Sequence, residues 1–222
     1  MFGKNKILKP EIHDGSHLDV VEIFPTFQGE GPYVGHPSVF VRLGGCNLAC
    51  DFCDTEFDSY QNLSLEKILT EVTTCAKNEA GEVVRKLVVI TGGEPLRQPI
   101  ERFCQELLSL NFLVQIETNG TLFRELPQEV KIICSPKISN GKYHQIRPDL
   151  LARIDAFKFI ISRGKKEYSQ VDEFGLNVPI YLQPMDEYDE AKNKENLALV
   201  LELAQKFGHR VSLQMHKILK IR

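Results

Sequence analysis

Three cysteines, Cys46, Cys50 and Cys53, lie within eight residues of one another, directly after an apolar segment that predicts a strand. A Cys-x3-Cys-x2-Cys loop can give one thiolate to each of three irons of a cubane cluster. The fourth iron of such a cluster then stays open to a substrate or a cofactor. The spacing of the cysteines therefore predicts a metal site on this loop.

Zinc is the alternative metal for the loop, and it would require a fourth ligand from elsewhere in the chain. The candidates for that ligand are Cys75, Cys104 and Cys134. Cys75 and Cys104 lie in helical patterns among apolar neighbours, where a free cysteine commonly behaves as a small hydrophobic residue. We interpret these two as core residues, and the spacing alone leaves iron–sulfur and zinc both open.

Four further polar segments each follow a predicted strand, at residues 91–95, 117–120, 135–137 and 183–186. Each of them also fits an ordinary turn, so none is specific by itself. Parallel α/β sheets, however, bind ligands at the carboxyl ends of their strands, where these segments and the cysteine loop are expected to meet. The glycines of residues 91–95 let a ligand approach the backbone, and Lys137 could neutralise a carboxylate.

The elements that position these segments are apolar runs that alternate with helical patterns, which is typical of parallel strands joined by crossover helices. We predict strands at residues 20–24, 38–43, 86–91, 113–117, 131–134, 156–161, 180–183 and 210–214. We predict helices from an N-cap at Ser64 through Val72, at residues 100–110, and at residues 195–207 with Gly208 as the stop. The sequence thus predicts one α/β core domain at residues 17–222, with the cluster loop at residues 46–53 and a loosely attached N-terminal extension at residues 1–16.

The composition of the 222 residues is that of an ordinary globular protein, with 42% hydrophobic and 26% charged residues. A net charge of −3 gives no positive field for a nucleic acid or an anionic membrane, so neither is an expected partner. No apolar run approaches the roughly 18 residues of a membrane span, and no apolar segment of a secretory signal follows the basic N-terminus. We therefore expect a cytoplasmic protein whose cysteines are thiols or metal ligands.

The cysteine loop after an early strand resembles that of the radical S-adenosylmethionine (SAM) superfamily, in which SAM chelates the open iron of a [4Fe-4S] cluster. The resemblance implies that Cys46, Cys50 and Cys53 bind this cluster. It also implies an abbreviated TIM-like barrel of parallel strands with outer helices, and SAM-binding roles for residues at the strand ends. These residues are Phe52, Cys53, Asp54, Gly93, Glu94, Glu117, Ser135, Pro136, Lys137, Gln183, Pro184, Met185 and Asp186.

Further segments make the resemblance more specific. Phe-Gln-Gly-Glu-Gly, an arginine before Gly-Gly-Cys, Cys-Asp-Thr, Thr-Gly-Gly-Glu-Pro, Glu-Thr-Asn-Gly, Ser-Pro-Lys and Gln-x-His-Lys follow in order between residues 20 and 222. Together they are similar to the 7-carboxy-7-deazaguanine synthase family. This resemblance implies a carbon–nitrogen lyase that converts 6-carboxy-5,6,7,8-tetrahydropterin to 7-carboxy-7-deazaguanine with loss of ammonia, by hydrogen abstraction and ring contraction. The reaction is a step towards queuosine and other 7-deazapurines.

The same resemblance implies roles for the remaining polar residues. The implied substrate contacts are Phe27, Gln28, Gly29, Arg42, Thr91, His216 and Arg222. Glu30 and His216 are the implied catalytic residues, and Thr55 is the implied ligand of a magnesium ion that also binds the substrate carboxylate. Taken alone, Arg42 also fits an ion pair and His216 a structural histidine on the last strand.

The family resemblance also implies a homodimer and an external one-electron reductant of the flavodoxin or ferredoxin type. Two alternatives remain open. A small radical SAM activase of glycyl-radical enzymes would use the same cluster and SAM segments, but it would give no reason for residues 27–31 or Thr55. A non-catalytic zinc or iron–sulfur protein would explain the cysteines, and its metal content and failure to cleave SAM would identify it.

Overall fold

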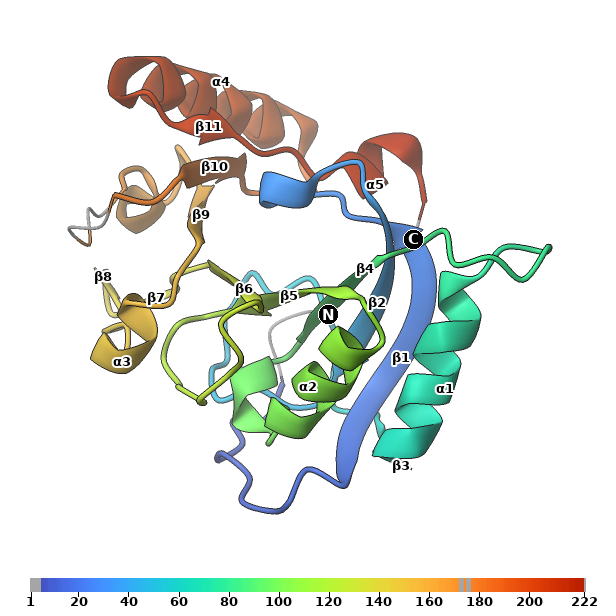
Figure 1. Ribbon diagram of the computed structural model, residues 1–222. Coiled ribbons are helices and arrows are strands. Elements are labelled where there is room, and N and C mark those ends of the chain that lie inside the picture. The colour runs from blue at the N-terminus through green and yellow to red at the C-terminus, as the bar shows by residue number, and fades with distance from the viewer. Residues whose placement is uncertain (1–4, 172–173, 175–176, 222) are drawn as a thin grey trace.

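A curved sheet of nine strands forms the centre of the protein, as the computed structural model shows for residues 5–171, 174 and 177–221 (Figure 1). Its strands are β1 (His17–Phe27), β2 (Pro37–Leu43), β3 (Gln61–Ser64), β4 (Leu87–Gly92), β5 (Leu113–Thr118), β6 (Lys131–Cys134), β9 (Ala156–Ile161), β10 (Ile180–Pro184) and β11 (Arg210–Val211). In space they follow the order β11-β10-β9-β6-β5-β4-β2-β1-β3. A separate small sheet pairs β7 (Ile138–Ser139) with β8 (Lys142–Tyr143).

Helices lie along the outer side of the curved sheet, where α1 packs on β1 and β2, α2 on β5, and α4 on β9 and β10 (Figure 1). The helices are α1 (Leu65–Ala76), α2 (Glu101–Ser109), α3 (Pro148–Leu151), α4 (Glu190–Phe207) and α5 (Met215–Leu219), with 3-10 turns η1 (Gly31–Tyr33), η2 (Pro95–Arg97) and η3 (Lys166–Tyr168). Within the described residues, no helix has both the length and the apolar character needed to cross a membrane.

The predicted α/β fold is confirmed, with a correction at its beginning. Every pair of neighbours from β2 to β11 runs parallel, but β1 pairs antiparallel with both β2 and β3. We did not predict β3, because its four residues, Gln-Asn-Leu-Ser, carry little apolar signal. The strand predicted at residues 210–214 ends at Val211, and the helix predicted from residue 195 begins at Glu190. The short elements β7, β8, α3 and α5 were not predicted either.

Local sequence signals explain the boundaries of the longer helices. The Ser64 hydroxyl accepts a hydrogen bond from the backbone N–H of Lys67 and so caps α1, as predicted. Asp189 caps α4 in the same way, which explains why this helix starts before its apolar face does. Gly208 ends α4 with a φ of 71°, a left-handed conformation that glycine adopts without strain.

Residues 5–16, which we call the N-terminal segment, are held against the core, so our expectation of loose attachment is wrong for them. The backbone N–H of Leu8 donates to the Cys46 carbonyl at 2.7 Å, and that of Glu11 donates to the Arg97 carbonyl at 2.7 Å. The Glu11 carboxylate also binds the Arg97 guanidinium at 2.6 Å. Backbone bonds and one arginine make these contacts, which no hydrophobic periodicity could have indicated. The domain boundary at residue 16 stays a prediction.

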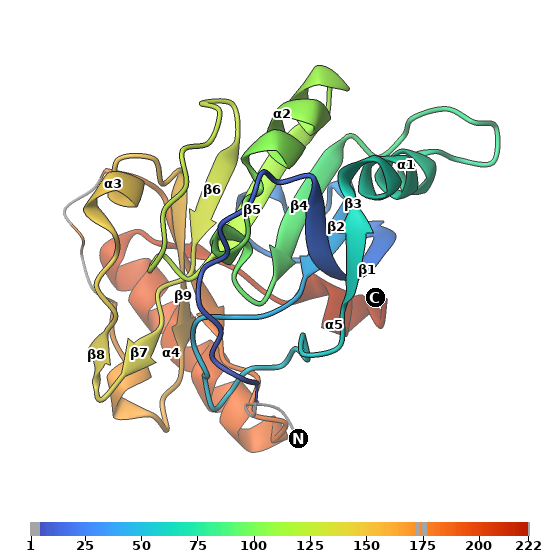
Figure 2. The same ribbon diagram turned by 90° about the horizontal axis from the view of Figure 1, so that it is seen from below.

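The carboxyl ends of the parallel strands meet at one rim of the sheet. The loop after β2 carries the three cysteines there, and the residues after β4, β5, β6 and β10 lie on the same rim (Figure 2). The segment after β11 crosses back towards β1, because the Met215 N–H donates to the Gly29 carbonyl at 3.1 Å. The fold thereby brings Asn5 and the residues around His216, which are far apart in the sequence, to the side where the predicted chemistry lies.

Candidate functional site

A cavity of about 420 Å³ opens at this rim, within the size range of small-molecule sites. It is lined by residues at or just after the ends of β1, β2, β4, β5, β6 and β10, by side chains of β9, and by residues at the start of α5. The predicted site residues that line it are Gln28, Glu30, Arg42, Cys46, Cys50, Phe52, Cys53, Asp54, Thr55, Thr91, Gly93, Glu117, Ser135, Lys137, Gln183, Pro184, Met185, Asp186 and His216. The structure thus brings together side chains that are up to 188 positions apart in the sequence, Gln28 and His216 being the most distant pair.

A few predicted residues are placed elsewhere. Those outside the cavity lining are Phe27, Gly29, Glu94 and Pro136. The Phe27 side chain is 45% exposed and lines a second, shallow hollow, which leaves only its backbone near Gln28. Arg222 lies outside the described residues.

The three thiols of the cysteine loop line one wall of the cavity. Cys46 is buried, whereas Cys50 and Cys53 are half-buried. Burial raises the pKa of Cys46 to about 12 and raises the pKa of Cys50 and Cys53 as well, so iron binding must displace three protons. Three thiols on one loop, facing a cavity with room for a further ligand, fit a cubane with an open iron.

The other cysteines lie in the hydrophobic core. Cys104 and Cys134 are fully buried there, and Cys75 packs against it from α1. Our interpretation of Cys75 and Cys104 as core residues is therefore confirmed.

Glu94 lies behind the cavity wall, where its carboxylate binds other parts of the protein. It is fully buried and accepts hydrogen bonds from the Thr118 hydroxyl at 2.7 Å and from the backbone N–H groups of Asn119 and Leu96 at 2.7 and 3.0 Å. Burial raises its pKa despite these bonds. The side chain predicted to contact SAM thus joins the ends of β4 and β5, while Gly93 remains at the cavity surface.

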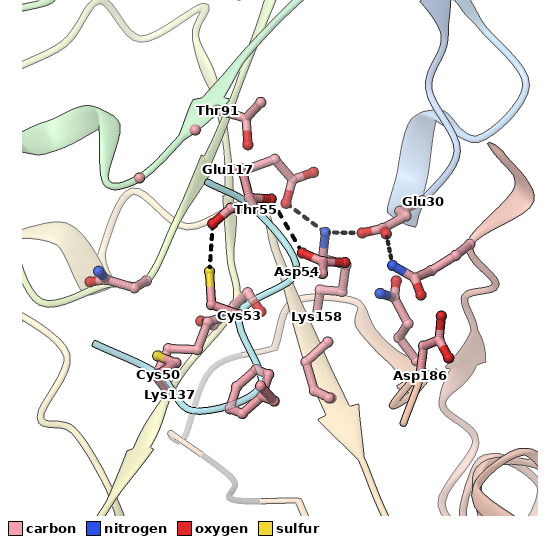
Figure 3. Close-up of a pocket in the computed structure, with 18 of the residues that line it drawn as sticks. Glu30, Cys50, Cys53, Asp54, Thr55, Thr91, Glu117, Lys137, Lys158 and Asp186 are labelled. Carbon is pink, nitrogen blue, oxygen red and sulfur yellow. Dashed lines mark hydrogen bonds and ion pairs between the residues drawn. The ribbon is translucent and has the colours of Figure 1, made fainter. Parts of the chain in front are cut away.

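A buried lysine lies between two carboxylates on the opposite side of the cavity (Figure 3). The Lys158 ammonium binds Glu30 at 2.6 Å and Glu117 at 2.8 Å, and its side chain is only 8% exposed. Gln214 donates to the other Glu30 oxygen at 3.0 Å, and Gln28 donates to Glu117 at 3.4 Å. Glu117, which we expected to contact SAM, therefore lies with the residues predicted for the substrate.

Burial and the ion pairs with Lys158 set the charges of Glu30 and Glu117. Burial alone would raise the pKa of Glu30, but the Lys158 charge and hydrogen bond outweigh it and hold this pKa at about 2. Burial prevails at Glu117, whose pKa is raised. The pKa of Lys158 is raised because the two carboxylates outweigh its burial. Lys158 therefore stays charged and keeps Glu30 ionised at neutral pH.

Sequence reasoning missed Lys158 because it lies inside a predicted strand, Ala-Phe-Lys-Phe-Ile-Ile, and site residues were expected after the strands. A single lysine inside such an apolar run was the available signal, since a fully buried lysine requires an anionic partner.

Arg42 and the residues around Asp186 form ion pairs at the cavity edge. The Nε of Arg42 binds Glu22 at 2.7 Å, so the ion pair considered from the sequence exists even though Arg42 also lines the cavity. Lys217 binds Asp186 at 2.7 Å and lies 3.6 Å from Asp54. These pairs join α5 and the loop after β10 to the cysteine loop.

His216 enters the cavity from α5, whereas the alternative considered from the sequence was a structural histidine on the last strand. Burial lowers its pKa, although Glu30 opposes this effect. The imidazole of His216 packs on Gly29. A Cβ atom added to Gly29 would lie 2.5 Å from Nδ1 of His216 and 3.2 Å from the backbone nitrogen of His216. Gly29 is therefore the residue that makes room for His216.

Gly29→Ala is expected to displace His216 and to lower the turnover rate by up to roughly a hundredfold, because small misplacements of reacting groups are costly. Gly164→Ala is the matched control, since the nearest atom to its added Cβ lies 4.0 Å away. Steady-state kinetics, with circular dichroism to verify folding, measures the effect. Wild-type turnover in the Gly29 variant would show that the His216 position is unimportant.

The chain is similar to a superfamily model, to curated relatives and to a solved structure. Residues 40–136 match the model of the Radical SAM superfamily. A 7-carboxy-7-deazaguanine synthase from Rickettsia prowazekii is 51% identical over 224 residues, which cover 100% of this chain and 96% of the relative. One from Rhodospirillum rubrum is 39% identical over 247 residues and covers both chains to 100%. The crystal structure of QueE from Escherichia coli matches 90% of this chain and 95% of its own, with a TM-score of 0.73 and 25% sequence identity.

Proposed function

The chain belongs to the 7-carboxy-7-deazaguanine synthase family of the radical SAM superfamily, and we propose that it converts 6-carboxy-5,6,7,8-tetrahydropterin to 7-carboxy-7-deazaguanine with release of ammonia. One observation carries this proposal: a single cavity holds the three thiols of the cysteine loop and, opposite them, the Glu30–Lys158–Glu117 group. The thiols suit a cluster that starts radical chemistry, and the polar group suits a substrate rich in N–H donors. A non-catalytic zinc or iron–sulfur protein would need only the thiols.

Membership in the superfamily brings with it a [4Fe-4S] cluster and SAM. Cys46, Cys50 and Cys53 would hold the cluster, each through one iron. When bound, the cluster and SAM would supply the radical chemistry that removes a hydrogen atom from the substrate. An external one-electron donor is required, because no redox group besides the cluster is implied.

We assign the SAM side of the cavity to residues around the cysteine loop. Phe52 lines the cavity and lies edge-on to Tyr168 with 5.2 Å between ring centroids, and an aromatic ring in this position suits contact with a nucleobase. Lys137 donates to the Ser135 hydroxyl at 2.7 Å and brings a positive charge suited to the SAM carboxylate. Gly93 offers backbone groups, and the residues after β10, from Gln183 to Asp186, complete this side.

We assign the substrate side to the residues around Lys158. Glu30 and Glu117 accept hydrogen bonds, and Gln28 both donates and accepts, which suits the amino and amide edge of a pterin. Arg42 is the cation assigned to the substrate carboxylate, and its pair with Glu22 would orient the guanidinium. His216, with a lowered pKa, is suited to accept and return a proton during ammonia loss.

Thr55 is proposed as a magnesium ligand, because its hydroxyl lies 3.2 Å from an Asp54 oxygen at the cavity wall and both are hard oxygen donors. Thr55→Ala is expected to raise the magnesium concentration for half-maximal turnover by roughly tenfold. Thr70→Ala on the exposed surface of α1 is the matched control. An unchanged magnesium dependence in the Thr55 variant would remove the assignment.

A homodimer is also proposed. Phe27, Val34 and Val84 are large apolar side chains that are each nearly half exposed, and Phe27 and Val84 line the shallow hollow beside β1. Side chains of this kind favour association with a second apolar surface. Light scattering should give twice the 25.3 kDa of one chain, and a monomer at micromolar concentration would contradict the proposal.

The central test is mass spectrometry of an anaerobic reaction with reconstituted protein, reductant, SAM, magnesium and 6-carboxytetrahydropterin. Formation of 7-carboxy-7-deazaguanine is the expected result. Cleavage of SAM to 5′-deoxyadenosine without this product would overturn the substrate. A protein that retains zinc and cleaves no SAM would overturn the enzyme class.

A further inference from the structure

The N-terminal segment reaches the cysteine loop at two points that the proposed function does not explain. Ile7 forms a parallel β-bridge with Cys46, and the Leu8 N–H donates to the Cys46 carbonyl at 2.7 Å. The segment runs beside the cysteine loop in Figure 2, where it is dark blue. A backbone contact at a cluster ligand restricts where that ligand can lie.

A buried arginine anchors the segment just beyond this contact. The Arg97 side chain is 2% exposed and donates to Glu11 at 2.6 Å and to the Gly44 carbonyl at 3.0 Å. Arg124 donates to the Glu11 carbonyl at 2.7 Å. Glu11 and the residues directly before Cys46 thus share one cation, so the segment and the base of the cysteine loop are fixed relative to each other.

At the other end of the segment, the side chain of Asn5 lines the cavity beside Cys53. Its Nδ2 lies 3.1 Å from the Thr55 carbonyl and 3.9 Å from the Cys53 sulfur. The Cys53 thiol itself donates to the Thr55 carbonyl at 3.4 Å. A thiol that binds iron loses its proton and can no longer donate. The two hydrogens of the Asn5 amide can then serve both acceptors, the Thr55 carbonyl and the Cys53 thiolate.

We propose that residues 5–11 are a positioning part of the metal centre: Asn5 donates a hydrogen bond to the Cys53 thiolate, and Leu8 holds Cys46 through its backbone. An N–H···S bond stabilises the more negative, reduced form of an iron–sulfur cluster and so raises its reduction potential. The Leu8 contact slows the loss of iron by holding the loop closed. This inference rests on the proposed function, because it requires an iron–sulfur cluster on the loop.

The first experiment is a redox titration of the reconstituted full-length protein, followed by electron paramagnetic resonance. Asn5→Ala is expected to lower the midpoint potential, while Asn5→Gln, which keeps the N–H donor, is expected to restore much of it. Ile12→Ala is the control, since Ile12 belongs to the same segment and is 99% exposed. A potential of Asn5→Ala equal to that of the wild type would overturn the role of Asn5.

The second experiment follows iron release to a chelator by the decay of the cluster absorbance. Leu8→Pro removes the N–H that binds Cys46 and is expected to speed the decay by roughly tenfold relative to wild type and Ile12→Ala. Equal decay rates would overturn the role of Leu8. If the wild type binds a cluster and forms product, and the variants have the same potential and decay rate as the wild type, only this inference is overturned. A wild type that loads no cluster overturns the proposed function and this inference with it.

Discussion

Replacing Lys158 with Met is expected to lower the free energy of unfolding by about 3–5 kcal/mol and to remove nearly all synthase activity. In the variant, Glu30 and Glu117 face each other at the buried end of the cavity without the Lys158 ammonium, which binds both of them in the wild type. For a chain of this length, a loss of this size lowers the melting temperature by roughly 6–20 °C. Calorimetry and product formation measure the two effects.

A second variant separates folding from function. Lys158→Met combined with Glu117→Gln leaves one carboxylate where the single variant leaves two, so the repulsion between them disappears. We expect this double variant to recover much of the lost stability but little of the activity, because the substrate side still lacks its cation. Full activity in the double variant would mean that Lys158 serves only to stabilise the fold.

The pH dependence of the stability of the Lys158→Met variant follows from Glu30. In the wild type the pKa of Glu30 is about 2, below its ordinary value of 4.5, so its contribution to stability is present above pH 4.5 and is lost as the pH falls towards 2. Without Lys158, burial is left as the largest cause and raises this pKa. The stability deficit of the variant should therefore be largest at neutral pH and shrink on acidification. A deficit that is constant between pH 4 and 8 would contradict this account.

The sequence allowed much of this site to be predicted, because one rule covers many of its residues. Parallel strands present their carboxyl ends at one edge, so a polar segment after a predicted strand could be placed in the site without knowledge of its contacts. Cys46, Thr91 and Lys137 were predicted to lie in the site by this rule, and all three line the cavity. The antiparallel β1 followed no such rule, because its direction is set by its pairing with β2 and β3, which the alternation of apolar runs does not reveal.

The residues that could not be predicted depend on contacts between distant segments. Glu94 follows β4 and Glu117 lies at the end of β5. The Glu94 side chain nevertheless lies behind the cavity wall, where it binds Thr118, whereas Glu117 binds Lys158. Gly29 carries no side chain, and its importance comes from a histidine 187 positions later. Residues 5–11 show no periodicity, because backbone hydrogen bonds and the partners of Arg97 hold them. Such contacts are made by the tertiary fold and leave no local signal.

Cys50→Ala is expected to abolish cluster binding and with it all cleavage of SAM. Three thiolates are the fewest protein ligands that hold a cubane while one iron stays open, and the core positions of Cys104 and Cys134 leave no thiol to replace the missing one. Residues 47–60 contain neither helix nor strand, so ligation of iron would do much to fix this part of the loop. Iron and sulfide analysis, the spectrum of the reduced protein and the yield of 5′-deoxyadenosine measure the effect.

Cys75→Ala is the matched control for this experiment, because it removes a half-buried thiol of α1 that packs against the core outside the cavity. It should keep the iron content and the SAM cleavage of the wild type, whereas Cys50→Ala should have neither. If Cys50→Ala retains a cluster that cleaves SAM, the loop is not the cluster site. If both variants lose the cluster equally, the loss reflects general instability of the protein. Only the difference between the two variants assigns the iron to the loop, because both changes remove one thiol from the same chain.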